Sequence, residues 1–321
     1  MTPLVAILSN PGSTTNRRSI DKVRALVQAS SHVLHVEVKR FEEIPEALRL
    51  MARAQPAVLV INGGDGTIQA SLSALINHAP FGERPPPVAV LPGGKTNMIA
   101  RDLGMRSSTV AELRRLLALV AAGGLAARRA RYPLIGLDRG DGGPVAYGMF
   151  FGAAGIVGGI DACRGKIYPL GLPNLLSHAL TMALIFFNVL ARGNVSHSLV
   201  RAAPMRINLK GGGILDGAFF IVMATTLSRL VMGLDPFMRQ GKGSLKFTAI
   251  EYRRATIWRA LLALLLGRFG RSMISGVHFR TVDAVRIMST QAVTLDGEMF
   301  APQPGQAMLL DGTKSLDFVK L

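Results

Sequence analysis

The sequence predicts two domains of different class, an α/β domain with a mostly parallel sheet and then an antiparallel β-sandwich. Three observations predict this division. The 321 residues suit about two domains at the usual ~150 residues each. Strand-like and helix-like segments alternate over the first third, which is typical of a parallel sheet with helices on its faces. After about Pro133, short strand-like segments separated by glycines follow one another, which favours a sandwich. We therefore expect domains at residues 1–133 and 134–321.

In the first domain, each expected strand is a short apolar run, and each expected helix has apolar residues at helical spacing. The strands are expected at 4–8, 32–38, 57–61 and 88–91. The helices are expected at 20–29, 44–54, 68–76, 97–103 and 110–121. In the second domain, strands are expected at 145–152, 205–209, 217–224, 244–249, 277–281, 284–288, 292–295 and 307–309.

Two apolar stretches interrupt the second domain. Residues 167–191 carry no formal charge, but the longest apolar run, 175–191, is at the lower limit for a membrane-spanning helix and contains His178 and Asn188. A buried or membrane-facing helix of a folded domain is therefore favoured over a spanning one. Residues 253–271 contain five arginines and no acid around an apolar run that starts with Trp258. This pattern fits either an interfacial helix on anionic lipid or a core helix with basic ends.

The charge balance points to an anionic partner. The chain has 37 Lys and Arg against 20 Asp and Glu, a net charge of +17, which attracts polyanions such as nucleic acid, anionic lipid headgroups or nucleotide phosphates. Aromatic residues are only 6%, so stacking platforms for nucleic acid are few, and we expect no nucleic-acid partner. The single cysteine, Cys163, excludes a disulfide framework and a Cys-rich metal site. The N-terminus has no basic segment and reads as a strand, not a signal peptide.

Three glycine- or hydroxyl-rich loops follow expected strands of the first domain. The sharpest is Asn62-Gly63-Gly64-Asp65-Gly66-Thr67, where glycines allow close approach of a ligand and the next helix offers free N–H groups to an anion. The others are Leu91-Pro92-Gly93-Gly94-Lys95-Thr96-Asn97 and Asn10-Pro11-Gly12-Ser13-Thr14-Thr15, the latter followed by Arg17 and Arg18. Each loop alone fits a plain turn, but three at the carboxyl ends of neighbouring strands predict a phosphate site. Asp65 suits such a site only with a cation such as Mg²⁺ between it and the phosphate.

A fourth motif, Asp296-Gly297-Glu298, lies almost 200 residues further along the chain. Asp-Gly is a common hairpin turn. The functional alternative is a general base with a helper carboxylate, which would deprotonate a hydroxyl or bind Mg²⁺.

The glycine-rich loop at 62–67 is neither a P-loop nor the dinucleotide fingerprint, because it lacks the residue spacing of both motifs.

In this order, the four motifs resemble the diacylglycerol kinase catalytic family, which includes bacterial lipid kinases and sphingosine kinases. Residues 151–155 with Asp161 fit the same family. The resemblance implies a three-layer α/β domain, a β-sandwich domain and a nucleotide cleft between them, with the last residues able to return to the first domain. It implies a kinase that uses ATP and Mg²⁺ to phosphorylate a lipid hydroxyl, most simply that of a diacylglycerol-like lipid. The expected location is cytoplasmic and peripheral, on the inner face of an anionic membrane.

The resemblance also assigns residues. Asp65 would bind Mg²⁺, and Asp296, Glu298 and Asp65 would be catalytic. The nucleotide-binding residues would be Asn10, Gly63, Gly64, Asp65, Gly66, Thr67, Gly93, Gly94, Lys95, Thr96 and Asn97.

Two departures from the family pattern keep alternatives open. Lys95 stands where the family usually has a nucleotide-contacting Thr, so either Lys95 supplies a phosphate contact or Thr96 takes that role. Lys242 lies where bacterial members often carry the acid of a structural Mg²⁺ site, which argues against that site here. A catalytically impaired nucleotide- or lipid-binding homologue therefore stays open. An NAD kinase also stays open, because NAD kinases share the motif at 63–67. The sequence indicates no oligomeric state.

Overall fold

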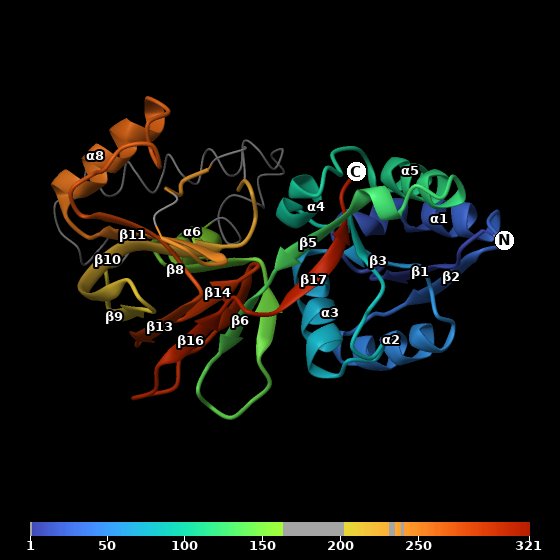
Figure 1. Ribbon diagram of the computed structural model, residues 1–321, viewed down its shortest axis with the longest axis horizontal. Helices are drawn as coiled ribbons and strands as arrows, with labels where there is room; N and C mark the ends of the chain where they lie inside the picture. The colour runs from blue at the N-terminus through green and yellow to red at the C-terminus, as the bar shows by residue number, and fades with distance from the viewer. Residues whose placement is uncertain (1, 163–201, 231–234, 239–240) are drawn as a thin grey trace. The chain divides into compact units, whose positions relative to one another are not determined.

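The computed structural model describes residues 2–162, 202–230, 235–238 and 241–321 (Figure 1). The chain divides into two compact units. Unit 1 comprises Met1–Leu134, Ala146–Gly148 and Ser315–Leu321, and unit 2 comprises Ile135–Val145 and Met149–Lys314. The last strand of the chain thus belongs to unit 1.

Unit 1 is built on a six-stranded sheet in the order β2-β1-β3-β4-β17-β5. The first four strands and β17 run parallel, and β5 pairs antiparallel with β17 at the edge. The strands are β1 (Val5–Ser9), β2 (Val33–Glu37), β3 (Val58–Gly63), β4 (Val88–Pro92), β5 (Arg129–Pro133) and β17 (Ser315–Val319). Strands β1, β3 and β4 are buried at every position, because helices cover both faces of the sheet.

Helices α1 and α5 lie on one face of this sheet and α2 and α3 on the other, so the unit has three layers (Figure 1). The helices are α1 (Asn16–Gln28), α2 (Ile44–Arg53), α3 (Asp65–Asn77), α4 (Met98–Asp102) and α5 (Thr109–Ala121). Their sequences explain the packing. In α2, for example, Ile44, Leu48 and Met51 recur at helical spacing and are fully buried. The predicted parallel α/β domain is confirmed.

The strand order creates a switch point between β1 and β3. The chain passes from β1 outward to β2, and then returns to place β3 on the other side of β1. The connections that leave the carboxyl ends of β1 and β3 therefore turn to opposite faces of the sheet. In open α/β sheets, ligands bind in the crevice that forms at such a point.

Unit 2 is built on a curled antiparallel sheet, which confirms the predicted class. Its hydrogen-bonded order is β15-β14-β8-β10-β9-β13-β16-β6, with β11 paired to β10 and β12 paired to β11. The strands are β6 (Ile135–Asp138), β8 (Phe150–Ala154), β9 (Ala203–Leu209), β10 (Gly213–Thr225), β11 (Leu245–Glu251), β12 (Val277–Val282), β13 (Ala284–Ser289), β14 (Val293–Leu295), β15 (Glu298–Phe300) and β16 (Met308–Asp311). Strand β9 alternates buried and exposed residues, as a sheet with one solvated face requires.

Two helices of unit 2 lie within the described residues. Helix α6 (Gly155–Ala162) follows β8, and α8 (Arg254–Leu265) packs against β11. The predicted strand at 145–152 is divided into β7 (Ala146–Gly148) and β8. The apolar stretch 167–191 lies outside the described residues. Among the helices of the described residues, none has the length and hydropathy needed to cross a bilayer.

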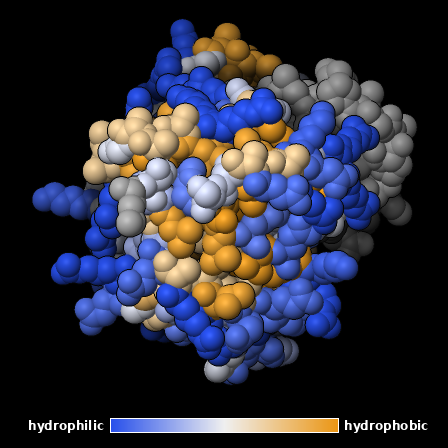
Figure 2. Space-filling model, turned by 90° about the vertical axis from the view of Figure 1, so that its right-hand side faces the viewer, coloured by the Kyte–Doolittle hydropathy of each residue, from blue (hydrophilic) through white to orange (hydrophobic). Residues whose placement is uncertain are grey.

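Several large apolar side chains remain exposed at the surface. Figure 2 shows a face on which hydrophilic residues (blue) surround smaller patches of hydrophobic ones (orange). Exposed apolar residues among hydrophilic ones are normal for a folded protein. The strongest concentration of exposed large apolar side chains among the described residues lies instead on and just after α8.

Candidate active site

The loops that follow β1, β3 and β4 lie against one another at the carboxyl ends of these strands. The backbone N–H of Thr15 donates to the carbonyl of Gly93 at 3.1 Å, and its hydroxyl donates to the carbonyl of Gly94 at 2.9 Å. A Cβ built on Gly94 would lie 3.0 Å from the Cα of Gly64. The structure thus brings together three loops that are separated by up to about 80 residues in the sequence.

The loop after β3 leads directly into α3. Gly64 is extended, with φ −81° and ψ 178°, and its carbonyl accepts the first helical hydrogen bond, from Ile68, at 3.0 Å. Asp65 is therefore the first residue of α3, where the free backbone N–H groups of the helix favour an anion. Gly63 has no room for a side chain, since its Cβ would lie 2.5 Å from the Cβ of Thr67. The Thr67 hydroxyl in turn accepts a 3.1 Å hydrogen bond from the Asn10 side chain.

The loop after β4 is held by Asn97. This residue has φ +51°, a left-handed conformation that Asn tolerates better than most residues. Its side-chain oxygen accepts from the N–H of Gly94 at 2.8 Å, and its amide donates to the carbonyl of Gly94 at 2.9 Å. Lys95 and Thr96 lie between Gly94 and Asn97 at the tip of the loop and are partly exposed.

A buried polar network lies beneath the loops. The amide of Asn16, which is fully buried, donates to the carbonyls of Asn10 and Asn62 at 3.0 and 2.9 Å. Asn62 donates to the Ser9 hydroxyl at 3.0 Å, and His35 Nε2 lies 2.8 Å from the same hydroxyl. Asn16 and Ser9 thus connect the first two loops. The sequence reasoning missed both, because an Asn at the start of a helix and a Ser at the end of a strand are common and carry no signal of a buried bridge.

Two titratable groups lie at the β1 side of this network. Burial lowers the pKa of His35 below its usual value, which favours the neutral imidazole beside Ser9. The guanidinium of Arg24 contacts Glu37 at 2.7 Å and lowers the pKa of that carboxylate. The region at the end of β1 is therefore neutral in its interior and carries its charge at the surface.

The late carboxylates belong to unit 2. Asp296 and Gly297 form the two-residue turn between β14 and β15, and their φ values of +49° and +91° are those of a type I′ hairpin. Asp296 is only 6% exposed. Its two oxygens accept from the backbone N–H groups of Phe150 at 2.8 Å and Met149 at 3.0 Å. Asp296 therefore fixes the start of β8, in addition to forming the turn.

Glu298 differs from Asp296 in its surroundings. It begins β15 and is partly exposed. Its carboxylate makes no hydrogen bond or ion pair within the described part of the chain. Of the two carboxylates, Glu298 is thus the one with oxygens available to a substrate.

The residues in the loops suit a metal that binds together with its substrate. In the described ranges, no three His, Cys, Asp or Glu side chains come close enough to enclose an ion. Asp65 is the acidic residue in the first turn of α3 and is partly exposed. Mg²⁺ commonly binds to one or two carboxylates and completes its octahedron with substrate phosphates and water. The donor set of unit 1 therefore fits a Mg²⁺ that arrives with a nucleotide.

Unit 1 has the strand order of open α/β domains with a switch point, which is where such folds commonly bind ligands. Residues 4–123 match the family model of the diacylglycerol kinase catalytic domain. The resemblance seen in the sequence motifs is thereby confirmed over this part of the chain, and the matched range contains all three loops. The match supports a lipid kinase family.

Solved structures of the same fold come from Bacillus anthracis str. Sterne. One is described as a diacylglycerol kinase and has 16% sequence identity and a TM-score of 0.66, covering 99% of this chain and 97% of its own. Two others, provisionally described as diacylglycerol kinases, have the same identity and coverage, with TM-scores of 0.68 and 0.67. At this identity the likeness establishes the fold alone. No curated protein matches the chain.

Proposed function

We propose that this protein is an ATP-dependent lipid kinase that transfers the γ-phosphoryl group of ATP to the hydroxyl of a diacylglycerol-like lipid. The observation that carries the proposal is the meeting of three glycine- or hydroxyl-rich loops at the switch point of a domain matched by the diacylglycerol kinase catalytic family. A lipid acceptor also implies that the protein works at a membrane surface, and the net charge of +17 favours an anionic one.

The loops would bind the nucleotide through its phosphates. Gly63, Gly93 and Gly94 let the loops pack closely against one another, Gly64 would let the phosphates approach the backbone, and the N-terminal N–H groups of α3 would donate to them. Asn10, Gly66, Thr67 and Asn97 hold or form the loops, while Lys95 and Thr96 are the candidates for direct contact. Asp65 would hold Mg²⁺, which would neutralise charge on the phosphates.

For the acceptor, the structure favours different roles for the two late carboxylates. A general base must have an oxygen free to accept the proton of the lipid hydroxyl. Both oxygens of Asp296 already accept backbone N–H groups, so we assign it a positioning role at the start of β8. We assign the base to Glu298. The lipid oxygen would attack the γ-phosphorus as Glu298 takes its proton, and the bond from that phosphorus to the bridging oxygen of ADP would break.

A lipid-panel assay tests the proposal. Purified protein with Mg²⁺ and radiolabelled ATP should phosphorylate diacylglycerol in mixed micelles, with a sphingoid base, a monoacylglycerol and soluble NAD as parallel acceptors. Label on a lipid supports the proposal and identifies the lipid class. Label on NAD alone would establish the alternative NAD kinase. Stabilisation by ATP with no labelled acceptor would establish an impaired homologue instead.

A further inference from the structure

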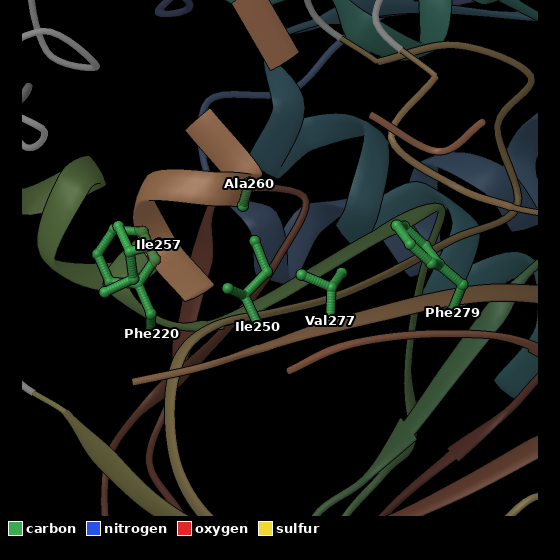
Figure 3. Packing of buried hydrophobic residues seen from close by; sticks show 6 residues of the cluster. All are labelled: Phe220, Ile250, Ile257, Ala260, Val277 and Phe279. Atoms are coloured by element: carbon green, nitrogen blue, oxygen red, sulfur yellow. The ribbon is translucent and has the colours of Figure 1, made fainter. Parts of the chain in front are cut away.

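Helix α8 has two apolar faces, and only one of them is covered by its own unit. On the inner face, Ile257 and Ala260 pack on the sheet in a buried cluster completed by Phe220, Ile250, Val277 and Phe279 (Figure 3). Thr256 is also buried, and its hydroxyl contacts the carbonyl of Ser275 at 3.3 Å. These contacts fix the rotation of the helix about its axis.

The other face carries large apolar side chains that remain exposed. Trp258, Leu262 and Leu265 are 53%, 57% and 74% exposed. They occupy positions i, i+4 and i+7, which lie on one side of a helix. Leu266 and Met273 extend the exposed apolar surface just beyond the helix, at 58% and 68%. Five of the nine most exposed large apolar side chains among the described residues therefore fall within 16 consecutive positions.

The charge around this face has one sign. Arginines 254, 259, 268 and 271 are exposed, and none of them pairs with a carboxylate within the described ranges. Arg253 pairs with Glu251 at 3.0 Å, and no Asp or Glu occurs between Glu251 and Asp283. The sequence pattern left open whether 253–271 is a core helix or an interfacial one. The structure contains both features, since one face is in the core and the opposite one is apolar, exposed and surrounded by cations.

We propose that the outer face of α8 and the turn after it, residues 254–273, dock this protein on the surface of an anionic lipid bilayer. Trp258, Leu262 and Leu265 would enter the boundary between headgroups and acyl chains, and Arg259, Arg268 and Arg271 would contact the anionic headgroups. Charge complementarity favours this occupant, because an anionic bilayer surface attracts clustered arginines while its acyl boundary accepts the apolar face between them. The biological use of the surface rests on the proposed lipid kinase function, but the docking itself does not require catalysis.

The protein contains its own reporter for the test, because Trp258 is its only tryptophan. Vesicles of phosphatidylcholine alone are compared with vesicles that contain phosphatidylglycerol, without ATP. On anionic vesicles we expect sedimentation with the lipid, a blue shift of Trp258 emission, and quenching by lipids brominated near the headgroup. Binding should weaken at least about tenfold when the salt is raised from 0.05 to 0.5 M, since screening reduces headgroup attraction.

Matched variants separate the apolar and the cationic contributions. Leu265→Glu should weaken vesicle binding about tenfold or more, because it removes a buried apolar group and adds a charge. Ile214→Glu is its control, since Ile214 is a similarly exposed apolar residue elsewhere in unit 2. Arg268→Glu should weaken binding to anionic vesicles but not to phosphatidylcholine vesicles. Arg286→Glu is its control, since Arg286 is also exposed. Activity on a dispersed short-chain diacylglycerol should be unchanged in all four variants.

The outcomes distinguish this inference from the proposed function. Unshifted Trp258 emission on anionic vesicles, or equal vesicle binding by Leu265→Glu and Ile214→Glu, would overturn the docking surface even if the kinase reaction is found. Docking with no phosphorylation of any lipid would support the surface and reject the kinase. A dimer that Leu265→Glu dissociates in sedimentation analysis would assign the face to a second copy of the chain and overturn the inference.

Discussion

Replacing Gly93 with alanine should destabilise unit 1 because three loops meet at this position. A Cβ on Gly93 would lie 2.7 Å from the carbonyl oxygen of Gly63, 3.0 Å from its nitrogen and 3.1 Å from the side-chain oxygen of Asn16. The first two are backbone atoms at the end of a fully buried strand, and Asn16 is fixed by two hydrogen bonds. The Gly63 atoms cannot move away without separating β3 from β4, and Asn16 cannot move without weakening its hydrogen bonds to Asn10 and Asn62.

The size of the effect follows from this overlap. Overpacking of a well-packed interior by a methyl group costs about 1–3 kcal/mol. For a cooperative unit of this size, each kcal/mol lowers the Tm by about 2–4 °C, so a decrease of roughly 2–12 °C is expected. Scanning calorimetry of the protein without ligand measures the decrease directly.

Gly64→Ala is the matched control for Gly93→Ala. Gly64 has an ordinary extended backbone, and its Cβ would lie 3.6 Å from the Cβ of Ser13 and 3.7 Å from the Cα of Gly94, which are normal contacts. The Tm without ligand should therefore stay within about 1 °C of the wild type. The added methyl group would, however, occupy the surface where we place the phosphates. MgATP at 100 times its Kd is expected to stabilise the wild type by about 2.7 kcal/mol and so to raise its Tm. This increase in Tm should be largely lost in Gly64→Ala.

The two variants can refute the reasoning separately. A Gly93→Ala protein with wild-type Tm would show that the loops are not packed as described. A Gly64→Ala protein that MgATP stabilises as strongly as the wild type would show that nucleotide does not bind over this loop, and would remove the main support for the proposed kinase.

Four further substitutions test the carboxylates and the buried network. Glu298→Gln should reduce kcat for lipid phosphorylation about 100-fold with little change in Tm. Asp296→Asn should instead lower the Tm, because an amide NH₂ group that faces a backbone N–H costs about 1–3 kcal/mol. The reverse pattern in kinetics and calorimetry would exchange the roles of the two carboxylates. Asn16→Leu should cost about 2–4 kcal/mol in urea unfolding, since two buried carbonyls lose their donor, while the exposed Gln28→Leu at the end of the same helix should be nearly neutral. Burial lowers the pKa of His35, so the unfolded chain binds its proton more readily, and stability should fall as the pH drops below about 6.5. His35→Gln should therefore lose less stability than the wild type between pH 7.5 and 5.5, a range above the titration of Glu37; equal losses would contradict a buried His35.

The central elements of unit 1 were predictable because they are apolar runs of the right length. Strands β1, β3 and β4 differ from their predicted limits by one or two residues. The start of α1 was placed too late, at residue 20, because its first turn, from Asn16 to Ser19, is polar and has no apolar periodicity. Asn16 is nevertheless fully buried, since its partners are the carbonyls of two loops. Hydrophobic spacing does not report that kind of burial.

Pairings between distant segments were not predictable from local pattern. Strand β17 inserts between β4 and β5, which lie about 230 and 185 residues earlier in the sequence. The predicted strand at 145–152 ends as two strands because the N–H groups of Met149 and Phe150 donate to Asp296. A carboxylate about 147 residues away thus decides where β8 begins, and no propensity of the segment itself contains that information.

The Asp296-Gly297-Glu298 motif shows why a turn and a functional site need not be alternatives. Asp-Gly is favoured in a type I′ hairpin because both residues adopt positive φ, as they do here. Most such turns project into solvent, but here Asp296 is buried against the start of β8, where its carboxylate accepts from two N–H groups. The turn therefore sets the backbone that presents Glu298 one residue beyond it. Under the proposed function, the same three residues form the hairpin turn and orient the base. A sequence that favours a turn is therefore not an argument against catalysis.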